Sequence, residues 1–250
     1  ITGVRGFDTP GSRRSAMAES PPLPPLAVDI DGTLTDDRRR LDHRVPSLLR
    51  EWADAAPVVV ATGKALPYPV ALCEFLGVPT TVVAENGGAA YVERTDELRF
   101  VGDRRAAEAV AEEYAAAGHS LGWGEVDLTN RWRETELAVS REQPLEPLEG
   151  IAARHGLEVV DTGFAYHVKS PDVDKAKGLT AVADALGIEV ESFAAIGDSA
   201  NDVGMLERAR ISYAVANADE AAREAADHVT DGTYGDGFIE AAERIRAGVD

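Results

Sequence analysis

The sequence predicts an α/β fold with a doubly wound parallel sheet as its core and a small α+β cap domain inserted into it. Short apolar, β-branched runs alternate along the chain with segments of helical spacing. Most of these runs are continuously apolar, which is typical of parallel strands covered on both faces. A middle region differs, because its strands alternate between apolar and polar residues.

The expected core elements follow one another along the chain. Six runs that end in small or acidic residues predict strands, at 26–31, 57–63, 80–88, 193–199, 211–217 and 227–230. Segments with apolar residues at positions i, i+3 and i+4 predict helices between them, at 45–55, 68–77, 177–187, 202–209, 219–227 and 237–248.

The middle region predicts the cap. It contains an expected helix, “RRAAEAVAEEYAAAG”, and alternating strands such as “TELAVS” and “GFAYHVK”. This pattern indicates a small antiparallel sheet with helices on one face and the other face free. We therefore expect a core made of 24–90 and 169–250, a cap of 91–168, and a hinge at “PDVD”. Residues 1–23, rich in Gly, Ser, Pro and Arg, are expected to be a disordered extension, with Met17 a candidate natural start.

Composition excludes several classes of protein. The chain has 44 acidic and 25 basic residues and a net charge of −19, which argues against nucleic-acid binding. No apolar stretch approaches the ~20 residues of a membrane span. The single cysteine, Cys73, lies at a helical core position, excludes a disulfide framework and fits a reducing compartment, so we expect a cytoplasmic protein. The few lysines and the acidic surface fit either a salty cytoplasm or a GC-rich genome, and composition does not separate the two.

The stretch “LAVDIDGTLTDD” carries two acids at the end of an expected buried strand. Asp29 and Asp31 are two residues apart, so their side chains share one face. They stand at the carboxyl end of a parallel strand, where α/β sheets bind ligands. Burying unpaired carboxylates is costly, so a positive partner is expected beside them.

Four motifs in order resemble those of the haloacid dehalogenase-like phosphohydrolases. They are “DIDGTLTD”, “VVVATGK”, “DVDKAKGL” and “IGDSANDVGML”. The resemblance spans about 26–240 and implies a Rossmann-like core. “VVAENGG” resembles the subgroup with an α+β cap between the second and third motifs (the Cof-type, class IIB caps). The short cap and “TGFAYHV” resemble archaeal phosphoglycolate phosphatases.

This resemblance implies a phosphatase mechanism that uses Mg²⁺. A carboxylate that attacks an anionic phosphate is repelled by it, and a divalent cation with oxygen ligands relieves that repulsion. Asp29 is expected to be the nucleophile and a metal ligand. Asp31 is expected to act as general acid and then general base, and to meet the metal through its backbone carbonyl. Asp198 is an expected metal ligand, and Asp202, one helical turn on, completes or orients the metal shell.

Further residues are expected to bind the phosphoryl group. Thr62, with Gly63 beside it, follows the second strand and would hydrogen-bond a phosphoryl oxygen. Lys175 would neutralise the transferring group, and Asn201 would assist in binding or cap its helix. Three other lysines compete with Lys175 for its role: Lys64, Lys169 and Lys177.

Some residues keep two interpretations. Asn86 in “ENGG” either faces the site or starts a hairpin, for which Asn-Gly is a strong signal. His167 either contacts substrate or packs, and Ser199 either caps a helix or supports the metal site.

The function that these motifs favour is Mg²⁺-dependent hydrolysis of a small phosphorylated metabolite, with 2-phosphoglycolate the leading substrate. A sugar-phosphate phosphatase of the same superfamily is the alternative within the class. A phospho-acceptor signalling or binding module is the alternative from another class, and Asp31 and the cap argue against it. The oligomeric state stays open between a monomer and a homodimer.

Overall fold

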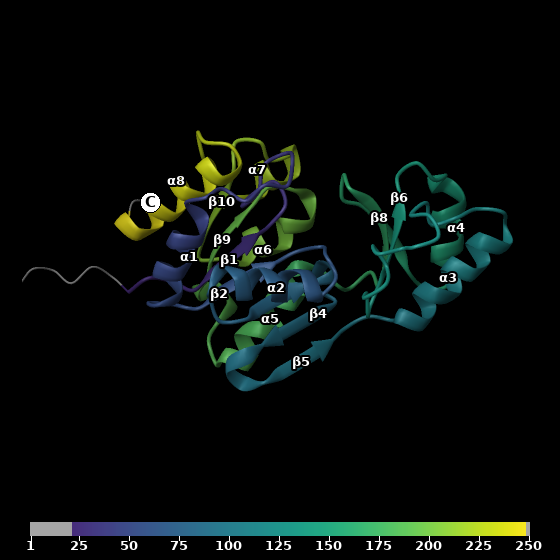
Figure 1. Cartoon of the computed structure of the whole chain (residues 1–250), viewed down its shortest axis with the longest axis horizontal. Helices are drawn as coiled ribbons and strands as arrows, with labels where there is room; N and C mark the ends of the chain where they lie inside the picture. Colours follow the sequence, from purple (N-terminus) through teal and green to yellow (C-terminus); the bar gives the residue numbers. More distant parts are fainter. Residues whose placement is uncertain (1–21, 249–250) are drawn as a thin grey trace, which may run out of the picture.

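A computed structural model describes residues 22–248, which form a large core and a smaller cap (Figure 1). Residues 1–21 lie outside the described part, including the expected start at Met17. Of the expected N-terminal extension, Leu23 is described and packs against the core.

The core contains one eight-stranded sheet in the order β11-β10-β9-β1-β2-β3-β4-β5. All neighbours from β11 to β3 are parallel, and β4 and β5 are antiparallel additions at the edge. The strands are β1 (Leu26–Asp29), β2 (Val58–Ala61), β3 (Thr81–Ala84), β4 (Ala89–Val92), β5 (Glu97–Phe100), β9 (Ala194–Gly197), β10 (Ile211–Ala214) and β11 (His228–Val229).

Helices cover both faces of this sheet. On one face α1 contacts α2 and α8, and on the other α6 contacts both α5 and α7. The helices are α1 (Val45–Ala53), α2 (Pro67–Leu76), α5 (Lys175–Leu186), α6 (Val203–Arg208), α7 (Glu220–Ala225) and α8 (Tyr234–Ala247). Short 3-10 turns add η1 (Glu85–Gly87), η2 (Glu93–Thr95), η3 (Val190–Ser192) and η4 (Ala200–Asp202).

The topology directs the site to the ends of β1 and β9. From β1 the chain builds outward through β2 and β3, and after the cap it returns to β9 and builds through β10 in the opposite direction. The point where strand order reverses is where the carboxyl ends of an open α/β sheet bind ligands. The four residues of β1 are buried, which explains the apolar character of the first three, Leu26 to Val28.

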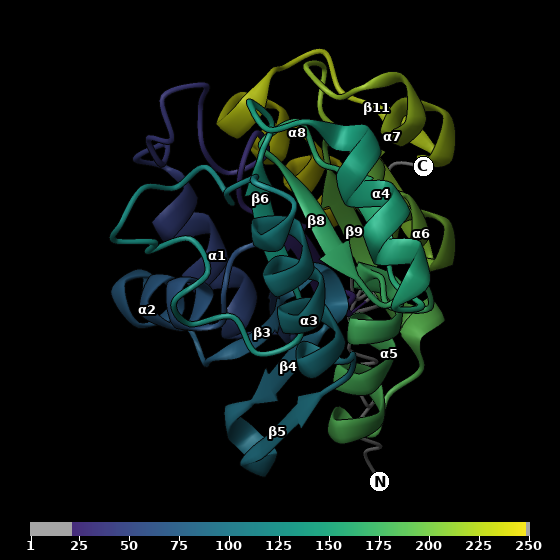
Figure 2. The ribbon, with the colours of Figure 1, turned by 90° about the vertical axis from the view of Figure 1, so that its right-hand side faces the viewer.

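The cap is an antiparallel sheet in the order β6-β8-β7, with two helices on its outer face (Figure 2). Its elements are α3 (Arg104–Ala116), β6 (Leu137–Ser140), α4 (Leu145–Arg154), β7 (Glu158–Asp161) and β8 (Ala165–Lys169). Leu137, Val139 and Val168 pack under the helices in a core separate from that of the large sheet. The alternate residues of the same strands face the other way, toward the large domain.

The cap was expected to begin at residue 91, but the structure places the boundary between core and cap later in the chain. Both strands belong to the large sheet, so residues 91–100 continue the core. A half-covered antiparallel edge strand alternates like a cap strand, and Leu98 and Phe100 are half exposed, so the pattern alone misassigned them. The chain crosses to the cap after β5, and the Asp103 N–H donates to Ser170 Oγ at 3.1 Å where it returns.

Two further sequence expectations concern single features. Cys73 is fully buried in the core, and burial raises the pKa of its thiol to about 12, as expected for a packing residue. Among residues 22–248, none of the helices has the length and apolarity that crossing a membrane requires.

Candidate active site

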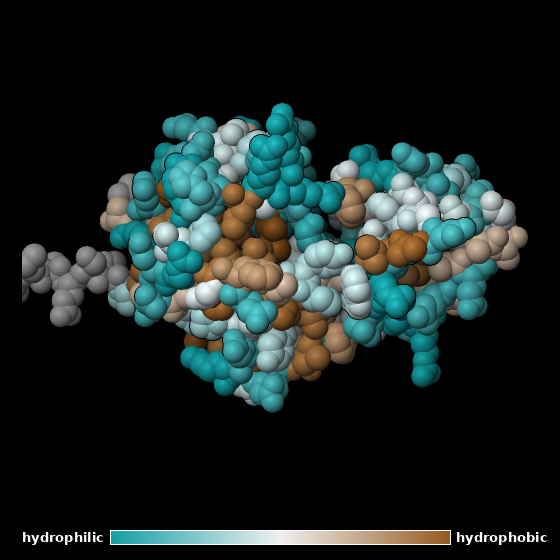
Figure 3. Space-filling view, viewed as in Figure 1, coloured by the Kyte–Doolittle hydropathy of each residue, from teal (hydrophilic) through white to brown (hydrophobic). Residues whose placement is uncertain are grey.

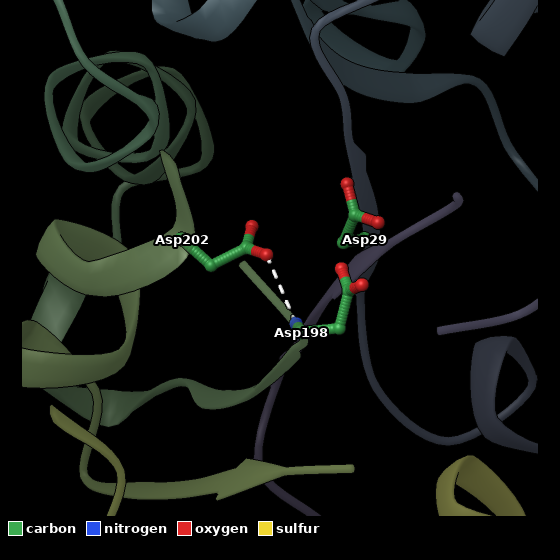
Figure 4. Close-up of side chains that lie close together, drawn as sticks. All are labelled: Asp29, Asp198 and Asp202. Carbon is green, nitrogen blue, oxygen red and sulfur yellow. Dashed lines mark hydrogen bonds between the residues drawn. The ribbon is translucent and has the colours of Figure 1, made fainter. Parts of the chain in front are cut away.

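Three aspartates meet at the carboxyl ends of β1 and β9 (Figure 4). Asp29 ends β1, Asp198 follows β9, and Asp202 ends the turn η4. A carboxylate oxygen from each lies within 4.8 Å of the other two. Ser199 caps η4 in a reciprocal box with Asp202, and Asp202 also accepts the Asp198 N–H at 3.1 Å. The helix-capping interpretation of Ser199 therefore describes its contacts.

Lys175 bridges two of these acids. It is the first residue of α5 and is fully buried, and its Nζ lies 2.6 Å from both Asp29 Oδ1 and Asp202 Oδ1. Burial alone would lower the pKa of Lys175, but the carboxylates of Asp202 and Asp29 outweigh it and raise that pKa. Lys175 is therefore charged and offsets part of the negative charge of the cluster.

The cluster contains three carboxyl groups and one lysine, so the carboxyl groups outnumber the cation. Burial raises the pKa of Asp29 well above its ordinary value, and Lys175 offsets this only in part. Burial and the neighbouring Asp202 raise the pKa of Asp198 to about 7. Asp198 Oδ1 is buried without a hydrogen-bond partner in the described part of the chain. An orphaned carboxylate oxygen in an all-oxygen donor set fits a hard divalent cation such as Mg²⁺.

Gly32 makes room for this arrangement. Its φ is +84°, and a Cβ built there would lie 2.1 Å from Asp198 Oδ2. A side chain at position 32 would therefore displace the Asp198 carboxylate, so the glycine of the first motif serves the close approach as well as the turn.

Asp31 stands beside the cluster, with its side chain 40% exposed. It lines the main cavity and forms an ion pair with Lys64, whose Nζ lies 2.7 Å from Asp31 Oδ2. Lys64 is thus a member of the site. The two remaining lysines are not: Lys169 binds Glu158 and the Val173 carbonyl, and the exposed Lys177 pairs with Asp172.

Of the other predicted binding residues, Gly63 and Asn201 line the cavity, whereas Thr62 does not. Thr62 is buried after β2, where its Oγ1 accepts the Lys64 N–H at 3.2 Å, and its neighbour Gly63 lines the cavity. Asn201 also lines the cavity, and its Nδ2 donates to Asn86 Oδ1 at 3.0 Å.

The cavity lies between the core and the cap and has a volume of about 280 Å³. Figure 3 shows the hollow between the two parts. Its core wall includes Asp29, Asp31 and Asp198, and its cap wall is formed by Arg133, Thr162, Phe164 and His167. A ligand held at Asp29 would therefore touch both parts of the molecule.

A buried polar cluster that the sequence analysis did not assign joins the cap to the core. Glu136 accepts from His167 Nδ1 at 2.8 Å, from Asn86 Nδ2 at 3.2 Å and from Arg133 Nη1. Arg133 Nη1 also donates to the Gly63 carbonyl at 3.0 Å. Asn86 was expected either to form a turn or to face the site, and each interpretation is right in part. Its backbone belongs to the turn η1 with φ +53°, and its side chain accepts a hydrogen bond from Asn201 at the cavity wall.

The alternation of apolar and polar residues in the cap strands could have predicted part of this polar cluster. Ala138 pairs with His167, so Glu136 and His167 share the sheet face that helices do not cover. A charged residue on the free face of a cap sheet points toward the site. Arg133 lies before the strand and carried no periodic signal.

Comparisons with known proteins identify the family of this chain. The chain matches the family of haloacid dehalogenase-like hydrolases over residues 26–112 and 150–241. It is 62% identical to a phosphoglycolate phosphatase from Natronomonas pharaonis, over 89% of this chain and 97% of that one. A phosphoglycolate phosphatase from Haloarcula marismortui is 61% identical with the same coverage. A crystal structure of a Thermoplasma acidophilum protein superposes with a TM-score of 0.78 at 24% identity, over 89% and 98% of the two chains.

Proposed function

This chain belongs to the haloacid dehalogenase-like hydrolases and is a phosphoric monoester hydrolase, and on that premise we propose that it hydrolyses 2-phosphoglycolate to glycolate and phosphate. The proposal includes dependence on Mg²⁺ and a phosphoryl-aspartate intermediate on Asp29. The observation that carries it is the buried Lys175, which bridges Asp29 and Asp202 beside the orphaned carboxylate of Asp198. The name shared by the relatives supports the choice of substrate.

In the proposed reaction, an Asp29 carboxylate oxygen attacks phosphorus while the bond to the leaving oxygen breaks. Asp31 gives a proton to that leaving oxygen, so glycolate departs as an alcohol. Asp31 then takes a proton from water, whose oxygen attacks phosphorus and restores the Asp29 carboxylate. Lys175 neutralises charge on the Asp29 side throughout. Asp29, Asp198 and Asp202, with the Asp31 backbone carbonyl, would hold Mg²⁺, which supplies charge neutralisation for the phosphoryl oxygens.

The setting of this reaction is part of the proposal. The cap would close over the site, exclude water and select the leaving group. We expect a small phosphorylated metabolite as the partner and the cytoplasm as the compartment, supported by the acidic surface and the single buried cysteine.

The test is phosphate release from 2-phosphoglycolate and a panel of sugar phosphates, with Mg²⁺ or EDTA, at low and multimolar salt. Turnover that favours 2-phosphoglycolate, needs Mg²⁺ and is lost in Asp29→Asn is the expected result. Asp96→Asn, at an exposed aspartate far from the site in sequence, is the matched control. Turnover on sugar phosphates alone would discard the substrate and keep the mechanism. Full turnover in Asp29→Asn would refute the assigned nucleophile.

A further inference from the structure

The cap wall of the cavity presents an arginine that is buried and held rigidly. Arg133 has a side chain only 3% exposed and lines the cavity. Its Nε donates to the Thr129 carbonyl, and its Nη1 donates to Gly63 and Glu136. Within residues 22–248 no hydrogen bond comes from Nη2, so one donor arm of a fixed guanidinium remains for a ligand.

His167 contacts the same carboxylate, Glu136, that holds Arg133. Burial alone would raise the pKa of Glu136, but His167 and Arg133 outweigh it and hold that pKa below its ordinary value. Glu136 is therefore ionised and accepts a hydrogen bond from His167 Nδ1. This leaves Nε2 as the ring nitrogen for a ligand, and Nε2 donates to a carboxylate in the imidazolium form. His167 also lines the cavity, and within residues 22–248 its Nε2 has no hydrogen bond.

Neither of the other cations of the cavity is placed as well to bind an anion. Lys64 already forms an ion pair with Asp31 at 2.7 Å. Arg39 is exposed and lies over the Phe164 ring, with its Cζ 4.9 Å from the ring centroid. Arg133 is the cavity cation that combines burial, several fixing contacts and an open donor arm.

We propose that Arg133, with His167 beside it, binds the carboxylate of the substrate's leaving group and so selects phosphate esters of short hydroxy acids. This inference rests on the proposed function and adds the residues that choose the substrate. In the proposed reaction the phosphoryl group lies at Asp29 on the core wall, with the fully buried Lys175 behind it, and the carboxylate faces the cap wall of the same cavity. An ester without a carboxylate would leave the arginine arm desolvated and unpaired, which is the basis of strong discrimination.

Glu136 and Asn86 act through Arg133 and His167 and are positioning residues. Asn86 Nδ2 also donates to Glu136 Oε1 at 3.3 Å, so both carboxylate oxygens are engaged. Glu85, one residue earlier, accepts the Thr135 N–H at 2.8 Å and ties the same cap segment to the core. These contacts fix where the guanidinium stands relative to Asp29.

The experiment compares 2-phosphoglycolate with ethyl phosphate, in which a methyl group replaces the carboxylate. Binding is measured by calorimetry with Mg²⁺ in an Asp29→Asn background, so that turnover does not interfere. The main variant is Arg133→Met with Glu136→Gln, which avoids leaving a buried unpaired carboxylate. Arg133→Lys, which keeps the charge, serves if the double variant does not fold. Arg131→Ala, at an exposed arginine of the same segment, is the matched control.

The parent protein is expected to bind 2-phosphoglycolate more tightly than ethyl phosphate. The double variant should reduce that preference by roughly 10- to 100-fold while ethyl phosphate binding changes little; Arg133→Lys should reduce it in part. In the active enzyme the same change should raise KM for 2-phosphoglycolate more than it lowers kcat. Equal losses for both esters, or an unchanged preference, would overturn the proposal. Cleavage of both esters by the wild type without preference would overturn this inference alone, whereas failure to bind or cleave either ester would overturn the proposed function too.

Discussion

Replacing Asp198 by asparagine should stabilise the metal-free protein at alkaline pH. Burial and Asp202 raise the pKa of the Asp198 carboxyl from 3.8 to about 7, so the folded state binds its proton more tightly than the unfolded state does. Between these two values the folded protein holds more protons, and its free energy of unfolding therefore falls as the pH rises. Asparagine has the same shape and carries no charge, so the variant lacks this loss.

The size of the effect follows from the two pKa values. A pKa difference of one corresponds to about 1.36 kcal/mol, which gives at most about 4 kcal/mol above pH 7. Water reaches part of the Asp198 side chain, and Asp198 and Asp29 titrate as a coupled pair. Both reduce the effect on the free energy of unfolding, which is expected to be on the order of 2–4 kcal/mol. For a chain of this size that is a rise of roughly 5 to 15 °C in Tm.

The assay is thermal and urea unfolding from pH 4 to pH 8.5, in EDTA and in Mg²⁺. In EDTA the wild type should lose stability between about pH 4 and pH 7, and Asp198→Asn should lose much less. In Mg²⁺ at 1,000 times the Kd the order should reverse at pH 8, because only the wild type gains the binding energy, about 4.1 kcal/mol, which exceeds its deficit in EDTA.

Two results would refute this reasoning. One is a wild-type protein in EDTA whose stability rises or stays level from pH 4 to pH 7. The other is an Asp198→Asn variant that Mg²⁺ stabilises as much as it stabilises the wild type, since that would remove Asp198 from the metal site.

Two further substitutions test the rest of the cluster. Lys175→Met should lower kcat/KM roughly 10²- to 10³-fold, because Asp29 and Asp202 lose their buried counter-charge; steady-state kinetics should show Lys177→Met unchanged, and equal effects would contradict the assignment. Gly32→Ala should weaken Mg²⁺ binding, because its Cβ would lie 2.1 Å from an Asp198 oxygen, whereas Gly118→Ala meets nothing within 4 Å at a similar positive φ. Calorimetric Mg²⁺ titration checks the pair, and the same Mg²⁺ affinity in both variants would refute the steric argument.

Local sequence patterns predicted the elements of the core well. The continuous apolar run of β1 and the helical spacing of α5 both depend on neighbours in the sequence, and the structure contains both elements. The edge hairpin of β4 and β5 was assigned to the cap, because alternation reports how a strand is covered and does not report which sheet it joins.

The core side of the site could also be predicted from local sequence patterns, whereas its cap side could not. Asp29, Asp198 and Lys175 stand at the ends of elements, and parallel strands bring their carboxyl ends to one edge, so their meeting followed from the fold class. Arg133 and His167 stand in a cap whose orientation no local pattern encodes. Their approach to the cavity depends on contacts between segments far apart in the chain, such as Arg133 to Gly63.

The sequence by itself determined the chemistry of the core, because strand, turn and helix-start preferences place acids and a lysine at one edge of a parallel sheet. Only the tertiary structure decided that Lys64 pairs with Asp31, that Lys169 and Lys177 have other partners, and which cap residues face the cavity. The physical reason is range: backbone preference and periodicity act over a few residues, whereas burial and ion pairing are set by residues far apart in the chain, such as Lys175 and Asp29, which are 146 positions apart.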